Sequence, residues 1–364
     1  MKQSSGFRHF SVVSSFVWWF VFLLVQTGFT QTNNLFDSDE PLSITLKGNV
    51  RDLLNDRTNA VPKNFPLELL IRNADSSVLS IPVQVKTRGH FRRMKENCNY
   101  PPLLIQFEDI NNNGIYKKTI FRNQRKLKLV MPCKGMEYTV KEWLVYKMYN
   151  LVTPLSFKAR LVQVTLEDAK AKKPVEPFYG ILLEEEEQMA KRNQLVLVEK
   201  KIQPQQAQVK PFLTMAVFEY MIGNTDWSVQ YLQNTKLVAK DSLARPTVIP
   251  YDFDHSGIVN APYALPAPEL QMSSVRERRY RGYCLQGLNQ FDEILALFNQ
   301  LKDKMYALYT TSTVLDARSI KSGVQFLDEF YATINNPKAW QKDFSYPCDK
   351  NGTGNVVIKG LRTD

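Results

Sequence analysis

The sequence predicts an α+β fold in which a β-rich N-terminal portion precedes a part with longer helices. Short segments of alternating apolar and polar residues, broken by Asn, Pro, Asp and Ser, follow one another from residue 40 to 90. Later segments have the apolar spacing of helices. These are Thr139–Leu151, Pro211–Gly223, Asn289–Tyr309 and Ala317–Ile334. The length of 364 residues, with 44% hydrophobic and 23% charged residues, is typical of a globular chain.

The N-terminus has the features of a secretory signal peptide over residues 1–31. Lys2 and Arg8 precede the apolar run from Phe16 to Val25, which is too short for a comfortable membrane span. We expect cleavage near Thr30 or Gln31, with a retained N-terminal anchor as the alternative because Phe29 makes the cleavage site imperfect. After removal of this segment, no apolar stretch of spanning length remains. We therefore expect a secreted, periplasmic or cell-envelope protein.

The four cysteines are widely spaced and none forms a CxxC pair. In an oxidising compartment this pattern favours disulfides over a metal site. The nearest-neighbour pairing, Cys98 with Cys133 and Cys284 with Cys348, is one of three connectivities. Reduced, buried thiols are the alternative.

The formal charge is +11. The lysines and arginines are mostly scattered among acidic residues, except in two basic segments, residues 88–95 and 274–284. A basic protein can bind nucleic acid, acidic polymers or phosphate ligands. No helix, finger or stacking motif of a nucleic-acid-binding module is present, so we expect no nucleic-acid partner. Most of these charges are expected to form solvated basic faces.

Residues 40–118 are expected to form the β-rich N-terminal portion, with a short helix near Leu53–Arg57. Residues 109–114 (DINNNG) match the first half of a calcium loop, in which oxygen-bearing side chains alternate. The twelfth position is Ile120, so the bidentate acid is missing. A hairpin turn explains the same residues, and we predict no calcium site.

From residue 119 to 344 the elements follow an order used in phosphoryl transfer. A strand carries Lys126 and Lys128, and a helix carries Glu142. Two strands follow, the second ending in the four acids Glu184–Glu187, and a buried helix then ends near Gly223. In kinase-like proteins a strand lysine holds the nucleotide phosphates and is positioned by a helix glutamate, a loop Asp accepts the hydroxyl proton, and an Asn and a later Asp hold the metal. Here Lys128 or Lys126 would be the lysine and Glu142 the glutamate. The pattern predicts a kinase-like fold over residues 119–344, with an N-lobe-like part to about residue 200 and a C-lobe-like part after it. We expect the tail, residues 345–364, to be a loop and a loose strand.

The second half of the candidate site lies in two loops. The first contains Asp226 and Asn234, and the second contains Asp252 and Asp254 directly after the apolar run VIP. A carboxylate beside a buried strand must be paired or bind a metal. His255 has no HxxxH or HxH partner, which favours a satisfied structural histidine. The GxSxG, GxGxxG and Walker motifs are absent.

The sequence resembles the CotH family of secreted atypical protein kinases and an uncharacterised group of secreted bacterial proteins related to it. The matching segments span about residues 80–260 and are VKTRGHFRR, NYPPLLIQF, RKLKLV, EWLVYKMYN, YGILLEEE, GNTDWS, QNTKLV and PYDFDHSG. The resemblance implies an atypical kinase-like fold that binds ATP with Mg²⁺ or Mn²⁺ and phosphorylates a secreted or surface protein. It implies Asp226 as the catalytic acid/base, Asn234 and Asp252 as metal ligands, and Lys128 as the phosphate lysine.

The sequence departs from a standard kinase at three places. Asp226 and Asn234 are eight residues apart instead of five, which leaves Asn224 or Gln230 as alternative ligands. The second loop reads DFD instead of DFG, so Asp254 could share or take the metal. The segment VKTRGH stands where a Gly-rich loop would cover phosphate, with Arg88 in place of glycines.

We therefore predict a secreted kinase that transfers phosphoryl from a nucleotide to a protein or glycan hydroxyl. One alternative is a non-catalytic binding or cell-envelope module, favoured by the longer spacing and the missing Gly-rich loop. Another is a metal-dependent phosphohydrolase that uses Asp226, Asp252 and Asp254.

Overall fold

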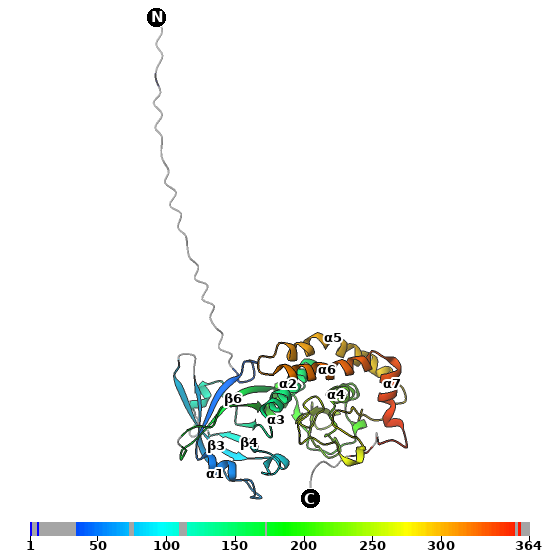
Figure 1. The fold of residues 1–364 in the computed structure, drawn as a ribbon. Coiled ribbons are helices and arrows are strands. Elements are labelled where there is room, and N and C mark those ends of the chain that lie inside the picture. The colour runs from blue at the N-terminus through cyan, green and yellow to red at the C-terminus, as the bar shows by residue number, and fades with distance from the viewer. Residues whose placement is uncertain are drawn as a thin grey trace.

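A computed structural model describes residues 1, 6, 34–72, 76–108, 115–171, 173–353, 356 and 357. Most of the strands lie at one end of the molecule and helices α4 to α7 at the other, with α2 between them (Figure 1). Apart from residues 1 and 6, the predicted signal peptide lies outside the described residues, as does the DINNNG segment. The mixed α+β class predicted from the sequence is confirmed.

The strand-rich end is a closed barrel with the strand order β1-β2-β3-β4-β5-β7-β6. The strands are β1 (Leu42–Gly48), β2 (Phe65–Arg72), β3 (Val78–Thr87), β4 (Leu103–Phe107), β5 (Lys126–Val130), β6 (Ala159–Asp168) and β7 (Phe178–Leu183). Neighbouring strands are antiparallel except β1 and β6, which pair in parallel. Apolar residues alternate along the strands, and their inward set fills the barrel core. Helix α1 (Val50–Asn55) contacts β3 and β6, and its Val50 and Leu53 belong to the barrel core.

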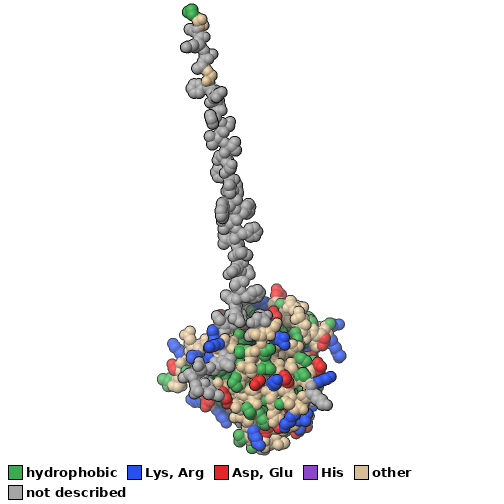
Figure 2. All heavy atoms as spheres, turned by 90° about the vertical axis from the view of Figure 1, so that its left-hand side faces the viewer, with side chains coloured by type: hydrophobic (Ala, Val, Ile, Leu, Met, Phe, Trp, Pro, Cys, Tyr) green, Lys and Arg blue, Asp and Glu red, His purple; other side chains and the backbone are tan. Residues whose placement is uncertain are grey.

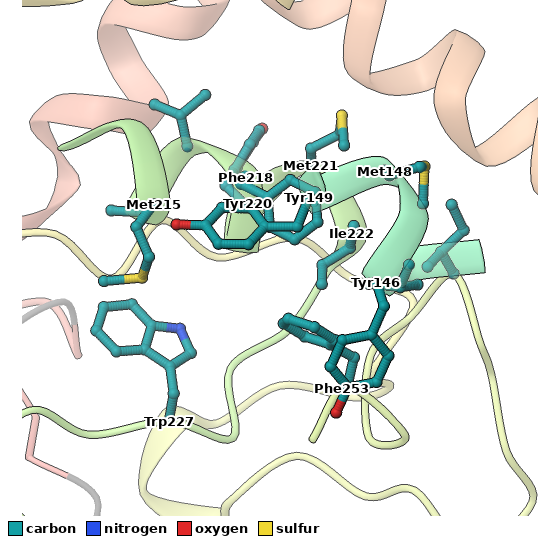
Figure 3. Packing of buried hydrophobic residues seen from close by; sticks show 14 of the residues in the cluster. Tyr146, Met148, Tyr149, Met215, Phe218, Tyr220, Met221, Ile222, Trp227 and Phe253 are labelled. Carbon is teal, nitrogen blue, oxygen red and sulfur yellow. The ribbon is translucent and has the colours of Figure 1, made fainter. Parts of the chain in front are cut away.

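Helix α2 (Met136–Val152) lies between the barrel and the helical end and is buried on several sides. Figure 3 shows its tyrosines Tyr146 and Tyr149 near α4 (Val209–Ile222) and near Phe253 of the second candidate loop. The ring centroids of Tyr149 and Phe218 are 4.6 Å apart, and those of Tyr146 and Phe253 are 4.9 Å apart. These contacts fix α2, α4 and the Phe253 loop relative to one another.

The remaining elements complete the helical end. The helices are α3 (Glu186–Arg192), α5 (Asp292–Thr310), α6 (Ala317–Ile334) and α7 (Pro337–Ser345). A small antiparallel sheet contains β8 (Val196–Leu197), β9 (Thr235–Ala239) and β10 (Thr247–Pro250), in the order β10-β9-β8. Strands β9 and β10 form the hairpin that separates the two candidate loops.

Several element ends agree with the sequence. Helix α6 has the predicted bounds, and α4 ends at Gly223, whose φ of 67° is the left-handed conformation that glycine adopts without strain. The acidic run Glu184–Glu187 was expected to end a strand, and this was wrong. Strand β7 stops at Leu183 because Glu185 caps α3 by accepting a hydrogen bond from the backbone N–H of Glu187.

The tail was expected to be a loop and a loose strand. Among its described residues, Tyr346–Cys348 instead form a 3₁₀ turn, and no strand is present there. Both nearest-neighbour disulfides are present, Cys98–Cys133 and Cys284–Cys348, which excludes the reduced-thiol alternative. No helix in the described part of the chain is long and apolar enough to cross a membrane.

Charged side chains of both signs are interspersed on the barrel side of the molecule (Figure 2). On that face no single sign gathers into a continuous patch, in keeping with the scattered charges of the sequence.

Candidate active site

A cavity of about 530 Å³ opens where the barrel meets the helical end. Its walls come from the segment after β3, from β5, α2, and the two loops that flank the β9–β10 hairpin. Of the eight residues selected from the sequence, seven line it: Arg88, Lys128, Glu142, Asp226, Asn234, Asp252 and Asp254. The eighth, Lys126, is not in the cavity wall, because its Nζ lies 2.7 Å from Oε1 of Glu185 on the barrel surface.

The first loop folds back on itself and so brings Asn234 to Asp226. Ser228 and Gln233 form an antiparallel bridge, which closes the intervening residues into a tight hairpin. The Nδ2 of Asn234 then donates to the backbone oxygen of Asp226 at 2.7 Å and to its Oδ2 at 3.0 Å. This hairpin accounts for the eight-residue spacing that separates the chain from a standard kinase loop.

The two alternatives to Asn234 have other roles. Asn224 lies beneath the loop, and its Oδ1 accepts a hydrogen bond of 3.0 Å from the N–H of Asp226. The side chain of Gln230 lies 3.4 Å from Ser228 and 3.5 Å from Gln203. Neither Asn224 nor Gln230 lines the cavity.

The carboxylate of Asp226 is held by two amides. Gln233 donates to its Oδ1 and Asn234 donates to its Oδ2. Burial raises the pKa of Asp226, while nearby His255 opposes the shift. Sequence reasoning did not select Gln233, although it lies in the same QN pair as Asn234. An oriented carboxylate with a raised pKa is suited to accept a proton.

Asp252 follows β10 and has an unusual backbone. Its φ is 65°, a left-handed value that costs energy in a residue with a Cβ, and such strain gathers at functional sites. The backbone N–H of Asp252 donates to the hydroxyl of Tyr146 at 2.9 Å, which ties the loop to α2. Burial and the charge of Asp254 raise the pKa of Asp252 to about 6.

Asp254 and Glu142 both meet Arg92, a residue that sequence reasoning did not select. Nη1 of Arg92 lies 3.4 Å from Oδ2 of Asp254 and 3.5 Å from Oε2 of Glu142. Tyr263 also donates to Oδ2 of Asp254, at 3.0 Å. Glu142, expected to position the phosphate lysine, is therefore paired with an arginine from the segment after β3. Arg92 is the second arginine of the segment RGHFRR (residues 88–93), in which sequence reasoning selected only Arg88.

Burial raises the pKa of Glu142 well above its usual range, although Arg92 opposes this. The pKa of Asp254 is lowered, because His255, Arg92 and Tyr263 outweigh its burial. Burial alone would lower the pKa of Arg92, but the surrounding acidic groups raise it. Arg92 thus remains a cation beside the two acids.

Lys128 reaches the cavity from β5 without a close acidic partner in it. Its Nζ lies 4.0 Å from Oε2 of Glu186 and 5.4 Å from the ring centroid of Tyr251. Burial and the charge of Arg88 lower the pKa of Lys128 to about 8. A buried ammonium next to a second cation is stabilised by an anionic ligand.

His255 also lines the cavity, between the rings of Phe91 and Tyr263 at centroid distances of 5.8 and 5.6 Å. Its buried Nδ1 has no hydrogen-bond partner among the described residues. The expectation of a satisfied structural histidine is therefore wrong at this nitrogen, although the charges of Asp226 and Asp254 lie near the imidazole.

The basic segment 274–284 supports the first loop from behind. Nη1 of Arg281 donates to the carbonyls of Thr225 and Trp227, both at 2.6 Å. Arg278 donates to the carbonyls of Met221 and Phe326. The expectation of a solvated basic face is wrong for these arginines, because they satisfy buried carbonyls around the end of α4.

The oxygen-bearing side chains of the cavity fit a hard divalent cation. Asp252 offers a carboxylate, and Asn234 offers its Oδ1 because its Nδ2 is used by Asp226. Within the described residues, no three His, Cys, Asp or Glu side chains are grouped to hold a metal by themselves. Mg²⁺ is commonly held by one or two carboxylates together with water and substrate phosphate, which this sparse donor set allows.

No protein-family model matches the chain, and no curated protein matches it. Among solved structures, the crystal structure of the Helicobacter pylori proinflammatory kinase CtkA is similar, with a TM-score of 0.35 and 12% sequence identity. The similarity covers 69% of this chain and 93% of that chain. A similarity of this degree assigns no function, so the functional argument rests on the cavity.

Proposed function

We propose that this protein is a metal-dependent phosphotransferase of the atypical kinase type, which transfers phosphoryl from ATP to a hydroxyl group. The observation that carries the proposal is the meeting of Lys128, Asp226, Asn234 and Asp252 in one cavity. These residues come from a strand and two loops that are distant in the sequence. The resemblance to the CotH family remains a prediction that agrees with this proposal.

Each residue has a role that its surroundings support. Lys128 and Arg88 bind the phosphates as cations in the cavity wall. Asp252, with Oδ1 of Asn234, holds the divalent ion, which when bound neutralises charge on the transferring phosphoryl group. Asp226 accepts the proton of the acceptor hydroxyl, and the amides of Gln233 and Asn234 keep its carboxylate in position.

Most of the catalysis in such a site comes from positioning and charge stabilisation, so few residue types are obligatory. The raised pKa of Asp226 matches the task of a base. The apolar side chains Val130, Leu183 and Leu232, which also line the cavity, offer a surface for a nucleotide base.

The acceptor we propose is a secreted or surface protein, or a glycan. Two disulfides fit an oxidising compartment, and the predicted signal peptide would deliver the chain there. A kinase in that compartment meets exported proteins and surface glycans, both of which offer hydroxyl groups.

The first test is metal-dependent nucleotide binding, measured as thermal stabilisation with ATP, with Mn²⁺ and with both. We expect a shift only with both, corresponding to about 2.7 kcal/mol at a ligand concentration 100-fold above the dissociation constant. The Asp252→Asn variant should lose this shift. The matched control is Asp241→Asn, which changes an exposed aspartate in the β9–β10 turn and should keep it.

The absence of any shift in the wild-type protein would contradict the proposal. Binding without phosphoryl transfer would favour the non-catalytic module. Phosphate release without an acceptor would favour the phosphohydrolase.

A further inference from the structure

Arg92 makes more contacts with charged groups of the site than any residue selected from the sequence. It is 8% exposed and belongs to the 3₁₀ turn Phe91–Arg93, just after Gly89 at the cavity edge. Its Nη2 donates to the carbonyl of Met131 at 2.6 Å, directly after β5. Its Nη1 faces Glu142 of α2 and Asp254 of the second loop. One guanidinium therefore joins β5, α2 and the second loop.

The two acids depend on this contact. Oε1 of Glu142 is buried and has no hydrogen-bond partner among the described residues. Among the described residues, Arg92 is the basic side chain that forms an ion pair with Glu142. Removing one member of a buried charge pair leaves the other uncompensated, which is strongly unfavourable. The positions of Glu142 and Asp254 are thus coupled to Arg92.

The pairing also frees two other groups. Because Glu142 is engaged by Arg92, Lys128 is left to meet a ligand, and its nearest acid is Glu186 at 4.0 Å. Oδ2 of Asp254 accepts from Tyr263 and faces Arg92, whereas Asp252, whose carboxyl group lies next to that of Asp254, forms no ion pair among the described residues. Asp252 is therefore the loop acid that a metal can reach without breaking an ion pair.

We infer that Arg92 is the positioning residue of the site: it replaces a lysine as the ion-pair partner of Glu142, anchors Asp254, and leaves Lys128 and Asp252 to contact the ligand. This inference rests on the proposed phosphotransferase function. A guanidinium suits the role because its planar fork reaches several acceptors at once, whereas a lysine ammonium is a single point charge.

The first arm of the test is a double-mutant cycle of Arg92→Met and Glu142→Gln, measured by denaturant unfolding without nucleotide. We expect Glu142→Gln to recover much of the loss caused by Arg92→Met, with a non-additivity of about tenfold or more in the unfolding equilibrium constant. Arg93→Met is the matched control, because Arg93 is the next residue and donates instead to the carbonyl of Asn59. Additive effects would overturn the pairing.

The second arm separates positioning from stability through kcat and KM, using ATP, Mn²⁺ and a general protein acceptor. Arg92→Lys keeps the charge but should lower kcat at least about tenfold with little change in the KM for ATP, since it misplaces groups and removes no phosphate contact. Lys128→Met should raise the KM for ATP at least about tenfold. Kinetics of Arg92→Lys equal to those of the Arg93→Met control would overturn the positioning role.

The two arms distinguish this inference from the proposed function. A wild-type protein that neither binds ATP with Mn²⁺ nor transfers phosphoryl overturns the proposed function, and the positioning role in catalysis with it. The unfolding cycle needs no ligand and would still decide whether Arg92 and Glu142 are paired. If Arg92→Met alone does not fold, recovery of folding in the double variant supports the pairing, and no recovery overturns it.

Discussion

The two arginine-rich segments of this protein, residues 88–93 and 276–281, have similar composition and different surroundings. Each is followed by a disulfide-bonded cysteine, Cys98 in the first case and Cys284 in the second. In the first segment Arg92 meets two carboxylates beside the cavity. In the second, Arg281 donates to backbone carbonyls beneath the loop that carries Asp226.

This difference separates two tasks of one residue type. An arginine among carboxylates at a cavity sets the positions of charged groups, so its loss should appear first in function. An arginine among carbonyls holds the backbone, so its loss should appear first in stability. Composition alone treats both segments as basic surface.

The largest expected effect sharpens the stability side of the comparison. Arg281→Met should lower the free energy of unfolding by about 3 kcal/mol, because it leaves the carbonyls of Thr225 and Trp227 without their donor and removes the contact of the guanidinium with the Trp227 ring. Urea unfolding checks this. Arg318→Met, at an exposed position of α6, should change stability by less than about 0.5 kcal/mol. Equal effects of the two variants would contradict the supporting role of Arg281.

A smaller effect concerns the pH dependence of ligand binding. The pKa of Lys128 is about 8, lowered by burial, by Arg88 and by Lys236, and opposed by Glu186 and Glu185. Its charge is therefore present below pH 8 and lost above it, so ATP affinity should fall by at most about tenfold per pH unit on the alkaline side. A bound phosphate favours the charged amine of Lys128, so the fall in ATP affinity should begin at a higher pH than the pKa of the free protein indicates.

Calorimetry between pH 7 and 10 measures this fall in affinity. The Lys128→Met variant should bind weakly with a flat profile. Lys126→Met should keep the wild-type profile, because Lys126 pairs with Glu185 outside the cavity wall and its pKa is raised. A fall of the same steepness in Lys128→Met would assign the titration to another group.

Local patterns made much of the fold predictable. Period-two alternation gave the barrel strands, and helical spacing with Gly223 gave α4 and its end. Closure of the barrel was not predictable, since β1 pairs with β6 across more than one hundred residues and no local signal encodes that register. The helix α3 was missed because its acids resembled a charged strand end, whereas the capping by Glu185 depends on side-chain geometry.

The residues of the site were largely predictable from the sequence, but the contacts between them were not. Residue order placed Lys128, Asp226 and Asp252 in one group, and the cavity brings them together. The partner of Glu142 was not predictable. Both Lys128 and Arg92 precede it in the sequence, and only the path of the segment after β3 places Arg92 next to it. Gln233 was missed for a similar reason, since it reaches Asp226 only through the hairpin at Ser228.

The most direct test of the proposed function compares phosphoryl transfer by the wild-type protein and the Asp226→Asn variant, using ATP labelled at the γ-phosphate, Mn²⁺ and a general protein acceptor. Loss of the base should lower transfer by about 10²- to 10⁴-fold, with ATP binding and the unfolding midpoint close to those of the wild type. Wild-type rates of transfer in Asp226→Asn, or no transfer by the wild-type protein itself, would contradict the assignment of this cavity as a phosphotransferase site.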